Sequence, residues 1–264
     1  MTSFLDTVIA ARRDTLARSF GQLGVADRER LACAARPPRD FLAALVGRPD
    51  VAVIAEVKKA SPSAGPIAPA CEASKQALHY QDGGAAAISV LTEPSFFGGS
   101  YTDLSDVADA VDVPVLAKDF VVDTVQLFAA RGHGADAVLL MVSVLGEDVG
   151  EYLDLAGTLG LTALVEVHDA AELDTALSAK AGLIGVNSRD LRTLEVHPEQ
   201  VAPIVSAAKD AGAVVVAESG VRTRDGVVSA AHAGADAVLV GEVLMRAEYP
   251  EDVLEELTGV AKRP

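Results

Sequence analysis

Five charged side chains of this sequence lie inside or directly after apolar runs, where a charge is costly to bury unless it is paired or used. Glu56 lies in the run VAVIAEV and Lys58 follows it, while Lys118 ends the run VPVLAK. Glu166 lies in LTALVEV, and Glu218 ends AVVVAE. One such group is usually a solvated ion pair. Lysines and glutamates brought together away from water tune one another's protonation and provide general acids and bases.

A second set of residues is suited to holding a dianion. Ser219 and Gly220 follow one apolar run in ESGVRT, and Gly241 and Glu242 follow another in LVGEVLM. Small residues leave backbone N–H groups open before the next helix, which is the common phosphate position at the end of a barrel. Because the Glu242 side chain would repel phosphate, we expect its backbone amide to be the contact.

The elements that must position these residues form a regular series of apolar runs bounded by turn residues. Continuous apolar runs are typical of parallel strands that are buried on both faces. Each unit of strand and connection takes roughly 27 residues, as in a closed eightfold barrel. We therefore predict eight strands, at residues 51–57, 85–91, 113–118, 136–142, 161–167, 182–186, 213–218 and 236–241.

The fold class predicted is α/β, a (β/α)8 TIM barrel with an N-terminal helical extension. Residues 1–264 are expected to form a single domain, with the extension at 1–50 and the barrel at 51–264. Two stretches of the extension have apolar residues at helical spacing, Phe4 to Leu16 and Phe41 to Leu45. Such an extension could pack on the barrel or serve as an arm that binds a partner. The echo GADAVL before the fourth and eighth runs supports the strand count.

Composition narrows the partners and the compartment. The net charge is −16 and no basic run is present, so we expect no nucleic acid as a partner. The N-terminus lacks an apolar signal core, and no apolar run is long enough for a membrane span, so a cytoplasmic protein without membrane contact is expected. Cys33 and Cys71 are expected to be buried or partly buried thiols. The histidines form no metal pattern, so no metal is predicted, and a capping or surface role is expected for His168.

Motifs along nearly the whole chain resemble a known family. IAEVKKASPS, TEPSFFGGSYTDL, VLAKDFVVD, LVEVHD, GVNSRDL, ESGVRT and GADAVLVGEVLMR, in this order, are similar to indole-3-glycerol phosphate synthase of tryptophan biosynthesis. The resemblance implies a cofactor-free lyase. It would close and decarboxylate 1-(2-carboxyphenylamino)-1-deoxyribulose 5-phosphate, a small anionic molecule, to indole-3-glycerol phosphate, CO2 and water. Neither the sequence nor the resemblance determines the oligomeric state, and a monomer is compatible with both.

The resemblance also implies roles for individual residues. Lys118 resembles the acid that protonates the ribulose carbonyl, Glu166 the base of the dehydration, and Lys58, supported by Glu56, a second cation near the sugar and phosphate. The assignment of the acid steps between the two lysines stays open. The other positions implied are substrate contacts through Ser61, Arg189, Asn187 and Glu218, an apolar lining of Pro62, Phe97, Phe120, Leu139, Leu191 and Leu239, and phosphate contacts at Ser219, Gly220, Gly241 and Glu242.

The chain departs from the family pattern at one position, and three other functions are alternatives. Many members carry a basic residue in SPSKG where this chain has Ala64, which affects only a contact of a mobile loop. Phosphoribosylanthranilate isomerase, a related barrel, would need a cysteine and an aspartate as acid and base at strand ends, and neither Cys33 nor Cys71 lies at one. A Schiff-base aldolase would use Lys118 and form an imine that borohydride traps. A barrel kept only as an interaction subunit would be expected to have lost strand-end residues.

Overall fold

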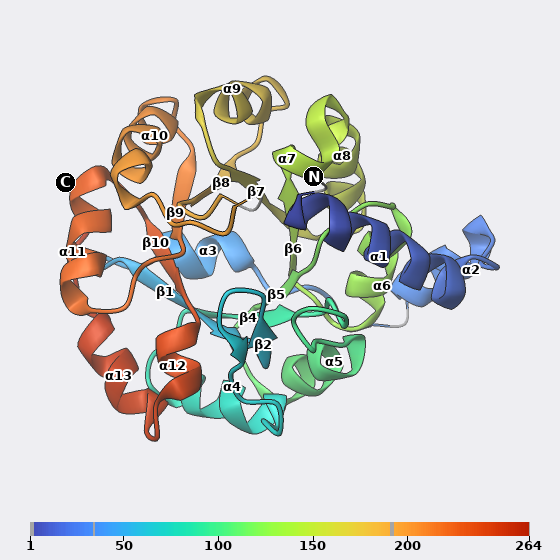
Figure 1. The fold of residues 1–264 in the computed structure, drawn as a ribbon, viewed down its shortest axis with the longest axis horizontal. Coiled ribbons are helices and arrows are strands. Elements are labelled where there is room, and N and C mark those ends of the chain that lie inside the picture. The colour runs from blue at the N-terminus through green and yellow to red at the C-terminus, as the bar shows by residue number, and fades with distance from the viewer. Residues whose placement is uncertain (1–2, 34, 191–192, 264) are drawn as a thin grey trace.

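Eight parallel strands close into a barrel in the computed structural model, which describes residues 3–33, 35–190 and 193–263 (Figure 1). The barrel strands are β1 (Ala52–Val57), β4 (Ala87–Leu91), β5 (Val115–Lys118), β6 (Ala137–Met141), β7 (Thr162–Val167), β8 (Leu183–Asn187), β9 (Val214–Glu218) and β10 (Ala237–Val240). Each lies within or one residue beyond its predicted run, and neighbours in sequence pair in parallel until β10 closes on β1. The predicted (β/α)8 fold is confirmed.

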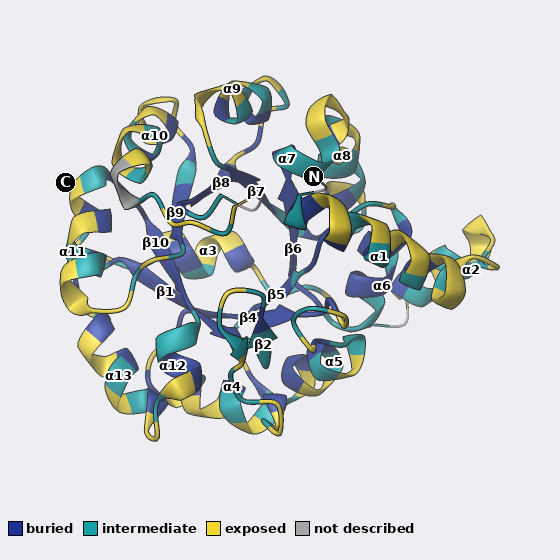
Figure 2. Ribbon diagram, in the orientation of Figure 1, coloured by how far each residue is buried: buried dark blue, intermediate teal, exposed yellow. Residues whose placement is uncertain are grey.

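Helices surround the barrel and connect its strands (Figure 1). They are α4 (Ala73–Asp82), α5 (Tyr101–Ala110), α6 (Val125–Gly132), α7 (Val142–Leu145), η1 (Gly146–Asp148), α8 (Val149–Thr158), α9 (Ala170–Ser178), α10 (Pro198–Asp210), α11 (Arg224–Ala233), α12 (Glu242–Arg246) and α13 (Pro250–Leu257). Their outer faces are exposed and the strands are buried (Figure 2). Among the described helices, none combines the length and apolar character that a membrane crossing requires.

Strand side chains alternate between two apolar layers because successive residues of a strand point to opposite faces. In β1, Val53 and Ala55 belong to the outer layer under the helices, whereas Ala52 and Ile54 belong to the layer inside the barrel. Glu56 continues the inward series, which explains why a carboxylate lies in a strand whose residues are all buried. The same alternation, set by the register of the strands, aims the other strand-end charges into the barrel.

The N-terminal segment contributes to the inner layer from two elements. Before β1 come α1 (Phe4–Phe20), α2 (Val25–Cys33) and α3 (Phe41–Val46). Phe41 and Leu45 of α3 pack into the inner layer, and α3 directly precedes the start of β1. Leu5 and Val8 of α1 join the same cluster. The two predicted helices are confirmed, α2 was not predicted, and α1 and α3 pack on the barrel.

The repeated segment GADAVL, at residues 134–139 and 234–239, makes the same backbone contact at both positions. The Asp136 carboxylate accepts a hydrogen bond from the Val115 backbone N–H at 2.8 Å, and that of Asp236 accepts one from Val215 N–H at 3.0 Å. Each aspartate therefore joins its strand to the start of the preceding strand. Lys209 neutralises Asp236 at 2.7 Å. A charge-assisted bond at these buried positions favours the native register.

Two expectations about local structure were wrong or incomplete. Cys33, expected to be buried or partly buried, is exposed at the end of α2, while Cys71 is partly buried as expected. After β1 the chain forms a small antiparallel hairpin of β2 (Ala60–Ser61) and β3 (Gly65–Pro66), which was not predicted. Two-residue strands carry too few residues to show a period of two.

Candidate active site

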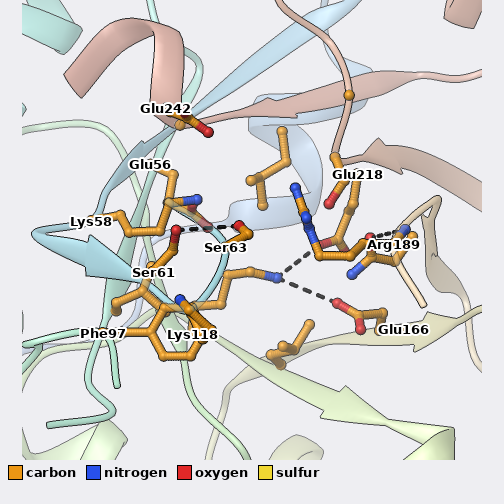
Figure 3. Close-up of a pocket in the computed structure, with 18 of the residues that line it drawn as sticks. Glu56, Lys58, Ser61, Ser63, Phe97, Lys118, Glu166, Arg189, Glu218 and Glu242 are labelled. Atoms are coloured by element: carbon orange, nitrogen blue, oxygen red, sulfur yellow. Dashed lines mark hydrogen bonds and ion pairs between the residues drawn. The ribbon is translucent and has the colours of Figure 1, made fainter. Parts of the chain in front are cut away.

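A cavity opens at the carboxyl ends of the barrel strands, and all eight strands contribute side chains to it (Figure 3). It contains every site residue predicted from the sequence that lies within the described part of the chain. Leu191 lies outside the described residues. The convergence was predicted from sequence because the carboxyl ends of parallel barrel strands all meet at one face.

Lys118 lies at the centre of this cavity between two glutamates. Its Nζ donates a hydrogen bond to Glu218 Oε2 at 2.7 Å and lies 3.4 Å from Glu166 Oε2 (Figure 3). The lysine comes from the end of β5, and the carboxylates come from β7, two strands away, and from β9, on the opposite side of the barrel. Both glutamates are almost fully buried. The Lys118 ammonium is therefore paired with two buried carboxylates in the cavity at the carboxyl ends of the strands.

The mutual charges of these three groups determine their protonation. Burial lowers the pKa of Lys118, but the charges of Glu218 and Glu166 more than offset it, so its pKa is raised and it remains an ammonium at neutral pH. Burial and the neighbouring Glu166 charge raise the pKa of Glu218 to about 7, despite Lys118. Burial opposes ionisation of Glu166 too, yet Lys118 and His168 lower its pKa. The pKa values of the two glutamates are thus shifted in opposite directions. Glu166 is ionised, and Glu218 can hold a proton near neutral pH.

A second lysine–glutamate pair lies at the end of β1. Lys58 Nζ donates to Glu56 Oε2 at 2.5 Å, and both side chains are largely shielded from solvent. Glu56 comes from β1 and Lys58 from the segment between β1 and β2. A Cβ added to Gly241 would lie 2.5 Å from that same Glu56 oxygen, so a larger residue there would have to displace the Glu56 carboxylate. The pair therefore lies directly against the first residue after β10.

The apolar part of the cavity is an aromatic slot. The rings of Phe97 and Phe120 lie 5.9 Å apart at an angle of 40°, and Leu139 and Leu239 complete the lining from β6 and β10. Phe4 of α1 also lines the cavity and packs edge-to-face on Phe96. A tilted aromatic pair with aliphatic neighbours suits a planar ring of a ligand.

Polar groups at the ends of β8 and in the hairpin face this slot. Asn187 Oδ1 accepts a hydrogen bond from the Arg189 backbone N–H at 3.0 Å, and one Arg189 guanidinium nitrogen donates to Leu194 O at 2.9 Å. Arg189 also lines the cavity. Ser61 Oγ accepts from Ala64 N–H at 3.2 Å, and Pro62 is beside it in the lining.

The predicted phosphate region has an unusual backbone. Ser219 has φ +63° and Gly220 has φ +80°, so two successive residues after β9 are in the left-handed region. Such a conformation is costly for serine and is concentrated at ligand-binding turns. Gly241 and Glu242 follow the neighbouring strand β10, at the start of α12. Arg222 also lines this part of the cavity.

Sequence reasoning missed several residues of the lining. Arg222 stands in the ESGVRT motif, so its basic side chain beside the expected phosphate turn was the available signal. Leu91 and Met141 end β4 and β6, where the rule that strand ends form the site would have found them. Phe4 had no such signal because it lies on α1, far away in sequence. His168, expected on the surface or in a cap, is partly buried and lies 3.3 Å from Glu166, so that expectation was incomplete.

Gly185 of β8 makes room for Glu218. A Cβ at this position would lie 2.1 Å from Glu218 Oε1 and 3.3 Å from Leu164. The Gly185→Ala variant is therefore expected to displace Glu218 and to lower kcat/KM by about 100-fold, since a shift of about 1 Å at a reacting centre has an effect of that size. Steady-state kinetics with a far-ultraviolet circular dichroism spectrum measures both activity and folding. Gly182→Ala, where a Cβ meets nothing within 4 Å, is the control. Equal kinetics for the two variants would contradict the prediction.

The fold and the cavity define a class: a (β/α)8-barrel enzyme with lysines and glutamates at the strand ends, an aromatic slot and an open glycine-serine turn. Residues 5–257 match the family model of indole-3-glycerol phosphate synthase. The chain is 46% identical to the indole-3-glycerol phosphate synthase of Mycobacterium ulcerans over 98% of its length and 95% of the relative's. It is also 46% identical to indole-3-glycerol phosphate synthase 1 of Streptomyces coelicolor, covering 99% and 97%. The chain belongs to the indole-3-glycerol phosphate synthase family.

Solved structures of other barrels are similar in fold alone. 3-Hexulose-6-phosphate synthase aligns with a TM-score of 0.62 at 15% identity, over 78% of this chain and 98% of that one. Thiamine phosphate pyrophosphorylase from Pyrococcus furiosus aligns with a TM-score of 0.60 at 19% identity, over 82% and 95%. Both relationships support the barrel architecture.

Proposed function

We propose that this protein converts 1-(2-carboxyphenylamino)-1-deoxyribulose 5-phosphate to indole-3-glycerol phosphate, CO2 and water. The observation that supports it most strongly is the Lys118 ammonium held between Glu166 and Glu218 beside an aromatic slot. The substrate has an aromatic ring, a carbonyl to be protonated and an anionic group at each end. The cavity offers a complementary group for each of these parts.

Lys118 acts as the general acid of ring closure. As the ring carbon that bears the carboxylate attacks the ribulose carbonyl, negative charge develops on the carbonyl oxygen. The Lys118 ammonium stabilises this charge and transfers a proton to it. Loss of CO2 then leaves its bonding electrons in the ring system. Recovered aromaticity drives this step, so it requires no electron-accepting cofactor.

Glu166 acts as the base of the dehydration that follows. It removes a proton from the intermediate as the new hydroxyl group leaves as water, a step that needs an ionised carboxylate at the start. An acid must protonate the departing hydroxyl, and Lys118 and Lys58 are both cations on the cavity walls. Asn187 and Glu218 orient the sugar hydroxyls in this proposal.

The two anionic ends of the substrate are bound at separate places. Arg189 and Ser61 hold the carboxylate until it leaves as CO2. The phosphate lies between the Ser219–Gly220 turn and the Gly241–Glu242 backbone, with Lys58 nearby. Arg222 adds a cation at this end of the cavity, which offsets the repulsion expected from the Glu242 carboxylate.

Single-turnover fluorescence with the carboxyphenylamino-deoxyribulose phosphate tests the proposed function. The expected result is an indole fluorescence that appears together with one equivalent of CO2, and no covalent adduct after treatment with borohydride. A borohydride-trapped adduct on Lys118 would support a Schiff-base aldolase instead. Binding without product would favour the interaction subunit.

The isomerase alternative has no support in the site. It would need a cysteine as acid or base at a strand end. Cys33 is on α2 and Cys71 precedes α4, and neither lines the cavity. The acid–base groups at the strand ends of the cavity are lysines and glutamates, and Asp119, which follows Lys118 in the lining, is held in an ion pair with Arg12.

A further inference from the structure

His168 lies between the active-site cavity and a second cavity. His168 is the first residue after β7, and it lines the second cavity. This cavity lies between the ends of β7 and β8 and helices α9 and α10. Asn187 lines both cavities. Glu166 is thus in contact with Lys118 on one side and with His168 on the other.

The imidazole ring bridges two carboxylates. Its Nδ1 lies 3.0 Å from Glu172 Oε2, and its Nε2 lies 3.3 Å from Glu166 Oε1. Glu166 Oε1 and His168 Nε2 are both buried, and neither has a hydrogen-bond partner among the residues that the structure describes. Two buried polar atoms that face each other at this distance satisfy one another when the ring rotates slightly. Glu166 Oε2 remains directed at Lys118.

The groups around the ring are mainly acidic. Glu166 comes from β7, Asp169 is the N-cap of α9, and Glu172 lies in the first turn of α9. Asp190 and His197 line the same cavity from the segment between β8 and α10. Burial lowers the pKa of His168, but the hydrogen bond to Glu172 and the charges of Glu166, Glu172 and Glu218 offset it, so the pKa is raised. The imidazolium therefore persists to a higher pH than that of a free histidine.

We propose that His168 is a positioning residue that selects Glu166 as the ionised member of the glutamate pair around Lys118. Both glutamates contact the lysine, but among the ion pairs of the described residues Glu166 alone has a second basic partner, His168, at 3.3 Å. A proton shared by the pair is thereby directed to Glu218, and Glu166 is free to act as a base. The role of Glu166 as a base rests on the proposed function. The effect of His168 on the ionisation of Glu166 rests on their contact and does not depend on the reaction.

The test compares the pH dependence of kcat/KM for wild type, His168→Gln, His168→Lys and His197→Gln. Without the imidazolium, Glu166 takes up a proton at higher pH, so the acid limb of the His168→Gln profile is expected to move to higher pH. A neighbouring cation typically moves a titration by about one unit or more, so the loss is about tenfold on the acid limb and smaller above it. His168→Lys is expected to restore the profile, and His197→Gln, which lines the same cavity, is expected to leave it unchanged.

A second measurement does not depend on activity. In protein with 13C-labelled glutamate carboxyl carbons, the Glu166 resonance is identified by its loss in Glu166→Gln and titrated in wild type and His168→Gln. A titration that moves to higher pH in His168→Gln supports the inference even if no product is formed, in which case the proposed function alone fails. An unmoved titration, or a loss of kcat/KM equal at every pH, would overturn it. His168→Asn is the second neutral variant if His168→Gln does not fold.

Discussion

Replacing Lys118 by alanine is expected to lower kcat by about 10²- to 10⁴-fold, the usual contribution of a positioned general acid. The variant loses the only group that lies within 3.4 Å of both buried carboxylates among the described contacts. Glu166 and Glu218 then repel one another, and one of them takes up a proton. The site thereby loses both its acid and the charge that holds its base ionised. The double effect is the reason for expecting the largest loss here.

Single-turnover fluorescence of wild type, Lys118→Ala and Lys118→Arg measures this loss. Arginine keeps the charge but is a far weaker acid, so Lys118→Arg separates electrostatic stabilisation from proton transfer. Lys75→Ala is the matched control, because Lys75 is an exposed lysine of α4 in a pair with Glu72. A Lys118→Ala variant within tenfold of wild type would refute the assignment of Lys118 as the acid.

The second large effect is expected at the joint between α1 and the barrel. Arg12 forms an ion pair with Asp119, and its Nε lies 2.9 Å from Asp119 Oδ1; both side chains are almost completely buried. Thr92 Oγ1 and the Phe120 backbone N–H also donate to this carboxylate, at 2.9 and 2.8 Å. Arg12→Met would leave Asp119 as a buried charge without its cation. We expect the free energy of unfolding to fall by about 3–5 kcal/mol.

Urea denaturation followed by circular dichroism measures this free energy. Arg18→Met on the same helix is the control, since Arg18 pairs with Asp14 where both side chains are about two-thirds exposed. Exposed pairs of this kind contribute about 0–1 kcal/mol. The double variant Arg12→Met, Asp119→Asn should recover part of the loss. A change below 1 kcal/mol in Arg12→Met would show that α1 is not anchored by this pair.

The same joint connects the N-terminal segment to catalysis. Asp119 directly follows Lys118, and Phe4 at the start of α1 lines the active-site cavity. Because α1 and α3 both contribute to the apolar layer inside the barrel, we propose that residues 1–264 fold as one domain in which residues 1–50 are an integral part. Loosening α1 is then expected to impair substrate binding at the aromatic slot as well as stability.

The sequence by itself determined the barrel and the edge at which its chemistry lies. Apolar runs repeated at a regular interval predict parallel strands, and the carboxyl ends of such strands meet at one face for geometric reasons. Glu56, Lys118 and Glu218 could therefore be placed in one site from their positions in three separate runs. The motifs then identified the family without any knowledge of distances.

Only the tertiary structure decided which of these groups contact one another. Lys118 and Lys58 look equivalent in sequence, yet Lys118 lies between two glutamates, whereas Lys58 pairs with one, Glu56, among the described residues. Strand tilt and register determine these partners, and they depend on closure of the whole sheet. Phe4 reaches the cavity through packing between α1 and the barrel, which are far apart in the chain. Contacts of this kind follow from shape and burial, which no local pattern of residues encodes.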